Sequence, residues 1–353
     1  RGGMAGPLRF FRHTKTPPEL VRVCRDDLLN LLNRGPAGSA TAAGPARDTA
    51  LAKSSKHLGQ LKAMMLGDGT NEPNEELAQQ AVVEASRGEL LRLICLSLQL
   101  LEFEARKDGA LVFSAILRHY NGGGPASSRR AYIKENKDLV QILGDGYNDS
   151  EVCLTKLSFG SMLRECMRIE ELAKEILHSP VLDTLFRHIE DPMFEVSSDA
   201  WVTFKELVTK RHKEAVAAYL EGNYDRFFGM YARLLVSENY VVKRQSLKLL
   251  AEVLLDPPNK PVMLRFISLT DNLKLMMNLL RSSSRAIQFE AFHVFKVFVA
   301  NPNKAPAVRE ILYNNRRKLV AYLEDFHSDK DDNAEFLEEK EVVLRAVRAL
   351  DEG

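Results

Sequence analysis

The sequence predicts an all-α protein, an armadillo/HEAT-like right-handed α-solenoid of about six to seven helical repeats. Three observations predict this fold class. Apolar residues recur every three or four positions almost throughout, strand-like alternation is scarce, and one residue pattern recurs near residues 200, 246 and 291. Successive offsets of 46 and 45 residues are typical of armadillo and HEAT arrays, whose periods are roughly 40–47 residues.

The amphipathic faces follow one another from residue 17 onward. The first begins after Pro17, where Leu20, Val21, Cys24 and Leu28 share one helical face. Proline-containing pairs such as Ser179-Pro180 and Asn301-Pro302 separate later faces. Further helices are predicted at about 50–66, 75–86, 88–101, 108–120, 129–143, 150–168, 170–178, 180–190, 196–212, 213–221, 223–236, 239–255, 260–268, 271–281, 285–300, 305–325 and 335–350.

Three glycine-rich or polar segments interrupt the N-terminal half, at 35–47, 67–74 and 122–128. Repeat arrays carry insertions in the loops between helices. We therefore expect a single repeat domain over residues 17–350 with loop insertions, preceded by a flexible N-terminal segment, 1–16.

The repeated pattern reads branched apolar, polar, small, large apolar, and three further apolar positions. A small residue at the third position lets neighbouring helices approach where the next repeat stacks. Chance similarity among amphipathic helices is the alternative, but all seven positions stay in register across three copies. The copies are Val196, Asp199, Ala200, Trp201, Phe204, Leu207 and Val208; Val242, Gln245, Ser246, Leu247, Leu250, Val253 and Leu254; and Ile287, Glu290, Ala291, Phe292, Phe295, Phe298 and Val299.

Composition excludes several classes of protein. Of 353 residues, 45% are hydrophobic and 27% charged, which excludes wholesale disorder. A net charge of +1 argues against a nucleic-acid binder led by bulk positive charge. No stretch has about 18 consecutive apolar residues, and four dispersed cysteines favour a reducing compartment. We expect a cytoplasmic protein without a membrane span.

Signatures of enzymes and metal sites are missing from the sequence. It contains no GxSxG, Walker, HExxH or strand–GxGxxG–helix motif. Asp329, Asp331 and Asn333 occupy the first, third and fifth places of an EF-hand-like loop, but Ala334 and Lys340 fill the places of its glycine and bidentate glutamate. We expect no catalytic activity, no cofactor and no metal.

Charge is unevenly distributed along the chain. Residues 201–322 hold 20 Lys and Arg against 10 Asp and Glu, a difference of +10, whereas residues 323–353 hold 4 against 11, a difference of −7. Arg244 and Lys248 lie one turn apart, either as an ordinary solvated face or as a basic wall suited to a carboxylate-ending peptide or an acidic loop. Of Met276 and Met277, one must be core, and the other can present a soft apolar surface.

Five long segments carry a family resemblance: GSMLREC (160–166), SDAWVTFK (198–205), SENYVVKRQSLKLL (237–250), LKLMMNLL (273–280) and IQFEAFHVFKVFVANPNK (287–304). They resemble the mouse-protein-25 scaffold family, also called calcium-binding protein 39. The resemblance looks close from about residue 160 to 350 and is looser but traceable earlier, at KTPPELV (15–21) and EFEARKD (102–108). Departures are the stretches 35–47 and 122–128, and Trp201 where the family commonly has phenylalanine.

The resemblance implies a non-enzymatic scaffold that binds and activates sterile-twenty-group protein kinases or a STRAD-type pseudokinase complex. It implies that a concave groove holds the Trp-Glu-Phe-type tail of the pseudokinase and supports the kinase-like domain. By residue-for-residue similarity, Arg244, Lys248, Lys274 and Met277 match tail-binding positions, and Tyr240 matches a kinase-contact position. A monomer within a hetero-complex is expected.

An armadillo-type peptide or cargo adaptor unrelated to kinases is the alternative function. Import-type grooves carry acidic or asparagine-rich ladders for basic cargo, whereas residues 201–322 are basic. The charge therefore favours the scaffold hypothesis over basic cargo.

Overall fold

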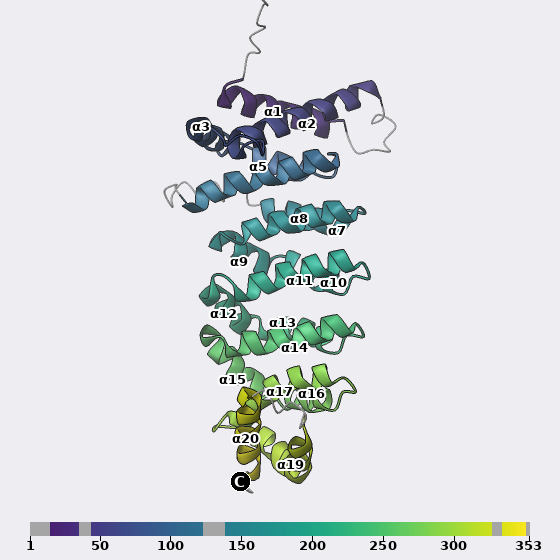
Figure 1. Cartoon of the computed structure of the whole chain (residues 1–353), viewed down its shortest axis with the longest axis vertical. Helices are drawn as coiled ribbons and strands as arrows, with labels where there is room; N and C mark the ends of the chain where they lie inside the picture. Colours follow the sequence, from purple (N-terminus) through teal and green to yellow (C-terminus); the bar gives the residue numbers. More distant parts are fainter. Residues whose placement is uncertain (1–14, 35–43, 123–137, 327–333, 351–353) are drawn as a thin grey trace, which may run out of the picture. The chain divides into compact units, whose positions relative to one another are not determined.

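The structure is a computed structural model that describes residues 15–34, 44–122, 138–326 and 334–350. Within these ranges the chain forms nineteen α-helices and one 3-10 helix, and no strand (Figure 1). The all-α prediction is confirmed. Contacts divide the chain into two compact units, residues 1–184 and residues 185–353.

Unit 1 is a stack of helices in which each helix of the series α2, α5 and α8 contacts the next member of that series. The helix α10 (Val181–Ile189) spans the boundary between the units. The unit 1 helices are α1 (Pro17–Leu32), α2 (Pro45–Leu66), α3 (Glu75–Ala85), α4 (Leu90–Ser97), α5 (Phe103–Gly122), α7 (Leu139–Asp149), α8 (Cys153–Cys166) and α9 (Glu170–His178).

Unit 2 follows the same order, with α11, α14, α17 and α20 in consecutive contact. A three-helix repeat is typical of armadillo arrays, so the armadillo-like solenoid prediction is confirmed within each unit. The unit 2 helices are α11 (Phe194–Thr209), α12 (Lys213–Gly222), α13 (Tyr224–Leu235), α14 (Tyr240–Leu255), η1 (Pro257–Asn259), α15 (Lys260–Ser268), α16 (Thr270–Leu280), α17 (Arg285–Ala300), α18 (Pro306–Asn314), α19 (Arg316–Asp325) and α20 (Ala334–Arg348).

The repeated pattern falls on α11, α14 and α17 in the same register. Its small residues Ala200, Ser246 and Ala291 are fully buried, at 0% exposure each. The apolar positions after them are also buried, apart from half-buried Trp201. Phe204 and Phe295, for example, are 0% exposed, and burying one such side chain stabilises the fold by roughly 1.5–3 kcal/mol. The repeat register is therefore confirmed.

One predicted helix is interrupted in the structure, so its prediction as a single helix was wrong. The single helix expected over 305–325 is two helices, α18 and α19, separated at Asn315. The backbone of Asn315 has φ −101° and ψ 0°, and its side-chain amide donates to the Ile311 carbonyl oxygen at 2.8 Å. This bond satisfies a carbonyl at the end of α18 and stabilises the break, because Asn side chains compete with helical backbone bonds.

The predicted helix 129–143 lies partly outside the described residues, and the helix that follows, α7, continues to Asp149. The next predicted helix, 150–168, begins only at Cys153, because Ser150 has extended backbone angles, φ −65° and ψ 126°.

The predicted insertions are only partly within the described residues. Pro45 begins α2, so the end of the 35–47 segment is helical, as suits a proline in a first turn. The 67–74 segment is a loop, in which the Asp68 carboxylate accepts from the backbone nitrogens of Thr70 and Asn71 at 2.9 and 2.8 Å. Residues 1–14, 35–43 and 123–137 lie outside the described part, and the single domain over 17–350 stays a prediction.

Candidate partner-binding site

Helix α16 divides its two methionines between core and surface. Met276 is 0% exposed and shares the buried face of α16 with Leu273 and Leu280. Met277, one position on, is half-buried. The prediction that one methionine is core and the other meets solvent is confirmed.

Met277 lines a pocket of about 790 Å³ in unit 2, between α16 and the helices α18 and α19. Three lining residues are cationic, Lys274, Arg281 and Lys318, and none is acidic. Lys274 also pairs with Asp271 at 3.4 Å, but both side chains are mostly exposed, so this pair is weak. The lining residues are Lys274, Met277, Asn278, Leu280, Arg281, Ile311, Asn315, Lys318, Leu319 and Tyr322.

The far wall of the pocket includes Tyr322, which α19 supplies. Its hydroxyl donates to the Leu280 carbonyl oxygen, which ties α19 to the end of α16. Burial raises the pKa of Tyr322, so the phenol stays neutral at physiological pH. The pocket therefore joins apolar surfaces (Met277, Ile311 and Leu319) with a cationic rim, a combination that suits an apolar side chain beside a carboxylate.

The other predicted positions lie along α14. Asn239 caps this helix, because its side-chain oxygen accepts from the backbone nitrogens of Val241 and Val242 at 3.0 and 3.3 Å. Tyr240 follows the cap and is 48% exposed. Arg244 and Lys248 are exposed one and two turns further on.

Arg244 is held by a residue of the next repeat. Its Nε lies 3.4 Å from Oε1 of Glu290 on α17, and the Glu290 side chain is only 10% exposed. The pair uses Nε, which leaves Nη1 and Nη2 of the half-exposed guanidinium to donate to a ligand carboxylate.

The five predicted residues therefore form two groups. Lys274 and Met277 share the pocket, whereas Tyr240, Arg244 and Lys248 lie on α14 and do not line it. Helix α17 contacts both α14 and α16, so the two groups border the same helix (Figure 1).

The sequence predictions missed the pocket residues Arg281, Lys318 and Tyr322. The basic run 316–318 was a signal in the sequence. Its significance depends on the packing of α18 and α19 beside α16, which the sequence pattern did not provide.

A second pocket, of about 470 Å³, lies beside Tyr240 between the start of α11 and the start of α14. Phe194 and Val241 line it and are 72% and 52% exposed. Trp201 and Val202 complete an apolar wall. Such a cluster of exposed large apolar side chains is typical of an interaction surface.

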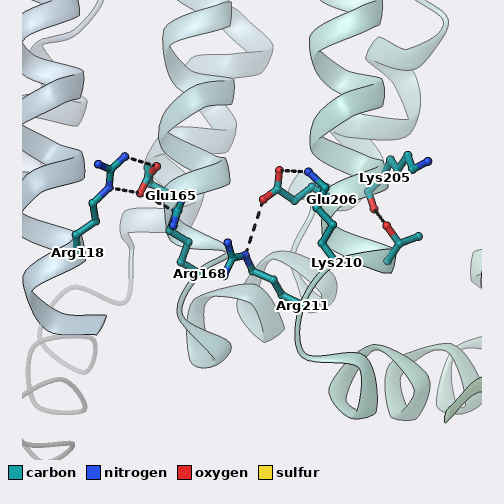
Figure 2. Close-up of polar contacts among 8 residues, drawn as sticks. Arg118, Glu165, Arg168, Lys205, Glu206, Lys210 and Arg211 are labelled. Atoms are coloured by element: carbon teal, nitrogen blue, oxygen red, sulfur yellow. Dashed lines mark hydrogen bonds and ion pairs between the residues drawn. The ribbon is translucent and has the colours of Figure 1, made fainter. Parts of the chain in front are cut away.

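Ion pairs connect the third helices of successive repeats. In unit 1, Arg118 of α5 reaches Glu165 of α8 at 3.0 Å, and Arg168 contacts the same carboxylate at 3.0 Å (Figure 2). The Arg118 pair connects neighbouring repeats, whereas the Arg168 pair is local, and the shared Glu165 side chain is only 12% exposed.

Unit 2 repeats the arrangement. Lys205 of α11 lies 3.0 Å from Glu252 of α14, and Lys296 of α17 pairs with Glu339 of α20. On α11, Glu206 also holds Lys210 at 3.4 Å (Figure 2). Part of the local positive charge is thus paired within the chain, whereas the large pocket has no acidic lining residue.

The described part of the chain lacks two further features. None of its helices is both long and apolar enough to cross a membrane. It also contains no group of three or more His, Cys, Asp or Glu side chains placed to hold a metal ion. The predicted EF-hand-like residues 329–333 lie outside the described part of the chain.

Comparison with known proteins shows which family the chain resembles. Residues 9–351 match the family model described as Mo25-like. The human "Calcium-binding protein 39-like" is 41% identical over 97% of this chain and 97% of its own length. The "Degreening-related gene dee76 protein" of Auxenochlorella protothecoides is 46% identical over 84% of this chain and 90% of its own length.

A designed armadillo repeat protein, YIII(Dq)4CqI, aligns with 80% of this chain and 99% of its own, at 12% identity and a TM-score of 0.41, too low to add to the assignment. The family match covers nearly the whole chain, including the helices that carry both pockets. The chain belongs to the Mo25-like family.

Proposed function

We propose that this chain is a non-enzymatic scaffold that binds and allosterically activates sterile-twenty-group protein kinases, alone or with a STRAD-type pseudokinase. The chain acts as a monomer within a hetero-complex in the cytoplasm. Membership of the Mo25-like family supports the scaffold class, and the resemblance of segments such as 237–250 and 273–280 supports the choice of partner.

The observation that carries the proposal is the large pocket of unit 2. A peptide ending in Trp-Glu-Phe brings aromatic side chains and two carboxylates. Met277 offers a polarisable apolar contact for an aromatic ring, while Lys274, Arg281 and Lys318 supply cations for the carboxylates. Arg244 and Lys248, across α17, extend the basic surface toward the residues that precede the tail.

The apolar surface beside Tyr240 is proposed to support the kinase-like domain. Phe194, Trp201 and Val241 surround a pocket into which an aliphatic or aromatic side chain of a partner fits. Burial of aromatic residues at the centre of an interface commonly contributes most of the binding energy.

Activation would follow from a shift of populations. A kinase-like domain exchanges between open and closed states, and a surface that binds only the closed state increases its share. This step needs no catalytic residue in the scaffold.

Peptide binding tests the tail site. We expect a peptide ending in Trp-Glu-Phe to bind, and Met277→Ala or Arg244→Ala to weaken binding about tenfold or more, equivalent to roughly 1.4 kcal/mol. Met263→Ala, at a half-buried methionine of α15 outside the pocket lining, is the matched control. Isothermal titration calorimetry measures the dissociation constants.

The same peptide with a C-terminal amide lacks the terminal carboxylate. Its affinity therefore separates the contribution of that charge to binding from the contribution of the apolar side chains. We expect the amide to bind more weakly to the unmodified chain. Equal affinity of Met277→Ala, Arg244→Ala and the unmodified chain would refute the tail site.

An armadillo-type cargo adaptor unrelated to kinases is the alternative. Affinity capture from cell extract with the full chain, scored for protein kinases, separates the two functions. Enrichment of kinases that Tyr240→Ala reduces would support the scaffold, whereas cargo without kinases would support the adaptor.

A further inference from the structure

A short loop, Arg281-Ser282-Ser283-Ser284, connects α16 to α17, which begins at Arg285. Two of its three serines support the local backbone. Ser282 Oγ accepts from the Ser284 backbone nitrogen at 3.2 Å, and Ser284 Oγ accepts from the Ile287 nitrogen at 3.4 Å, which caps α17. Modification of either hydroxyl would disturb the start of α17.

Ser283 differs from its neighbours. It is exposed, and no hydrogen bond engages its hydroxyl within the described residues. A group added to this oxygen therefore displaces no capping interaction. Of the three serines, Ser283 is the one that can be modified while the loop keeps its fold.

The charges around Ser283 suit a phosphoryl acceptor. Arg281 lies two residues before it and Arg285 two residues after it, and both are exposed. Arginine side chains close to a serine are recognised by the acidic substrate grooves of basic-directed kinases, and they also form charge-assisted bonds with the product phosphate.

Arg281 connects this loop to the large pocket, because it is one of the three cationic lining residues. The formal charge of the lining at neutral pH is therefore +3. A phosphoserine carries about −1.5 to −2 charges at pH 7. One phosphate at position 283 would neutralise about half or more of the charge that the pocket offers to a carboxylate ligand.

We propose that Ser283 is a phosphorylation site for a kinase that reads flanking arginines, and that its phosphate weakens binding of an acidic tail in the neighbouring pocket. Ser283 Oγ forms a bond to the γ-phosphorus of ATP, the bond from that phosphorus to the β,γ-bridging oxygen breaks, the hydroxyl proton is lost, and ADP leaves. The regulatory half rests on the proposed function, whereas the modification itself does not.

The test uses the full chain with ATP and a purified arginine-directed serine kinase, followed by tandem mass spectrometry to locate the phosphate. The dissociation constant of the Trp-Glu-Phe peptide is then measured for phosphorylated and unphosphorylated chains. We expect phosphate on Ser283, at least a tenfold loss of affinity, and neither effect in Ser283→Ala. Ser283→Glu should weaken binding several-fold without a kinase.

Asn303→Asp is the matched charge control. It adds one negative charge on an exposed residue of the loop at the other end of α17, roughly 24 Å away for a helix of 16 residues. Peptide affinity should change less than twofold in this variant.

Each outcome decides one part of the inference. Phosphate on Ser282 or Ser284 instead, or none in the loop, overturns the modification site. Phosphate on Ser283 with unchanged peptide affinity overturns the regulatory step. If the unphosphorylated chain does not bind the peptide, the proposed function fails, while the mapped phosphate still decides the modification site.

Discussion

Ala200, Ser246 and Ala291 occupy equivalent places on three successive third helices, and each is completely buried. At such a place the packing permits a side chain of one or two heavy atoms. The hydroxyl of Tyr231, for example, donates to the Ser246 carbonyl oxygen at 2.7 Å, so an aromatic residue of α13 lies directly over α14 at this place. The small side chains therefore determine how closely neighbouring helices approach. A larger side chain would increase the distance between these helices.

A larger side chain at Ala291 should destabilise unit 2. Ala291→Leu adds three carbons to a filled site, and overpacking of this kind costs about 1–3 kcal/mol. Urea unfolding followed by circular dichroism measures the free energy of unfolding. Ala300→Leu, exposed at the end of the same helix, should change it by less than about 0.5 kcal/mol, and equal losses in both variants would contradict the packing argument.

His293 is expected to make the stability of unit 2 depend on pH. It lies on α17, and its Nδ1 is 3.6 Å from Glu339 Oε2. Burial, and then the charge of Lys296, lower its pKa below 6.5, against the opposing effect of Glu339, Glu290 and Glu335. The folded state therefore favours neutral histidine, which adds stability above pH 6.5 that is lost as the pH falls through the lowered folded pKa.

His293→Gln should reduce this dependence. We expect the loss of unfolding free energy between about pH 7.5 and pH 5.5 to be smaller in the variant, because one group that protonates more readily in the unfolded chain is removed. An unchanged pH dependence in His293→Gln would exclude this residue as a source.

At the scale of the element, helix α7 contacts α8 through glycine. A Cβ built on Gly146 would lie 2.2 Å from Cζ of Phe159, whose ring is 1% exposed. Gly144 has a similar restriction, because its Cβ would lie 2.4 Å from Cγ2 of Val181. The two glycines allow α7 to approach its neighbours more closely than alanine would.

Two glycine-to-alanine changes should therefore have opposite signs. Gly146→Ala is expected to lower the free energy of unfolding by about 1–3 kcal/mol, because Phe159 must move. Gly229→Ala on α13 meets no atom within 4 Å and should raise it by about 0.5–1 kcal/mol. Thermal and urea unfolding measure both, and stabilisation by Gly146→Ala would contradict the close packing of α7.

Element boundaries show what the sequence could and could not predict. Helices such as α9 and α15 end where predicted, because apolar spacing and Pro or Ser signals coincide there. The break at Asn315 was missed, because the apolar residues on both sides, Leu312 and Leu319, are seven apart and keep a helical period across it.

The candidate site was predictable to a similar degree. Met277 and Arg244 could be predicted as site residues from local pattern and resemblance, because each lies on a helix whose buried face is evident from the spacing of its apolar residues. Arg281 and Lys318 are 37 residues apart by their numbers, and only the packing of α18 and α19 beside α16 brings them to one pocket. Such pairings depend on tertiary contacts that no period in the sequence encodes.

For the whole molecule, charge and apolar packing have separate roles. The net charge is +1, yet residues 201–322 carry a local excess of 10 basic residues, the difference between 20 and 10. Ion pairs between repeats, such as Arg118 with Glu165, have a largely exposed partner and contribute about 0–1 kcal/mol each. Buried apolar side chains therefore contribute most to the stability of each unit, whereas the exposed cations contribute little to it.

Salt should weaken peptide binding more than it changes the stability of the fold. Raising NaCl from about 0.1 to 1 M shortens the screening length from about 10 to 3 Å. We expect the affinity for the Trp-Glu-Phe peptide to fall at least several-fold, whereas the free energy of unfolding changes by less than about 1 kcal/mol. The C-terminally amidated peptide should show a smaller salt effect, and an equal effect on both peptides would argue against a carboxylate in the pocket.

The contact of each third helix with the third helix of the next repeat has a consequence for how the chain is made. Within unit 1, α5 contacts α2, α3, α4 and α8, and within unit 2, α14 contacts α11, α13, α15 and α17. Each helix thus finds its partners within about one repeat of sequence, and such arrays fold by local nucleation and propagation. During synthesis on the ribosome, an early repeat can pack as soon as the next repeat has emerged. Little of its apolar surface therefore stays exposed until the C-terminus has been synthesised.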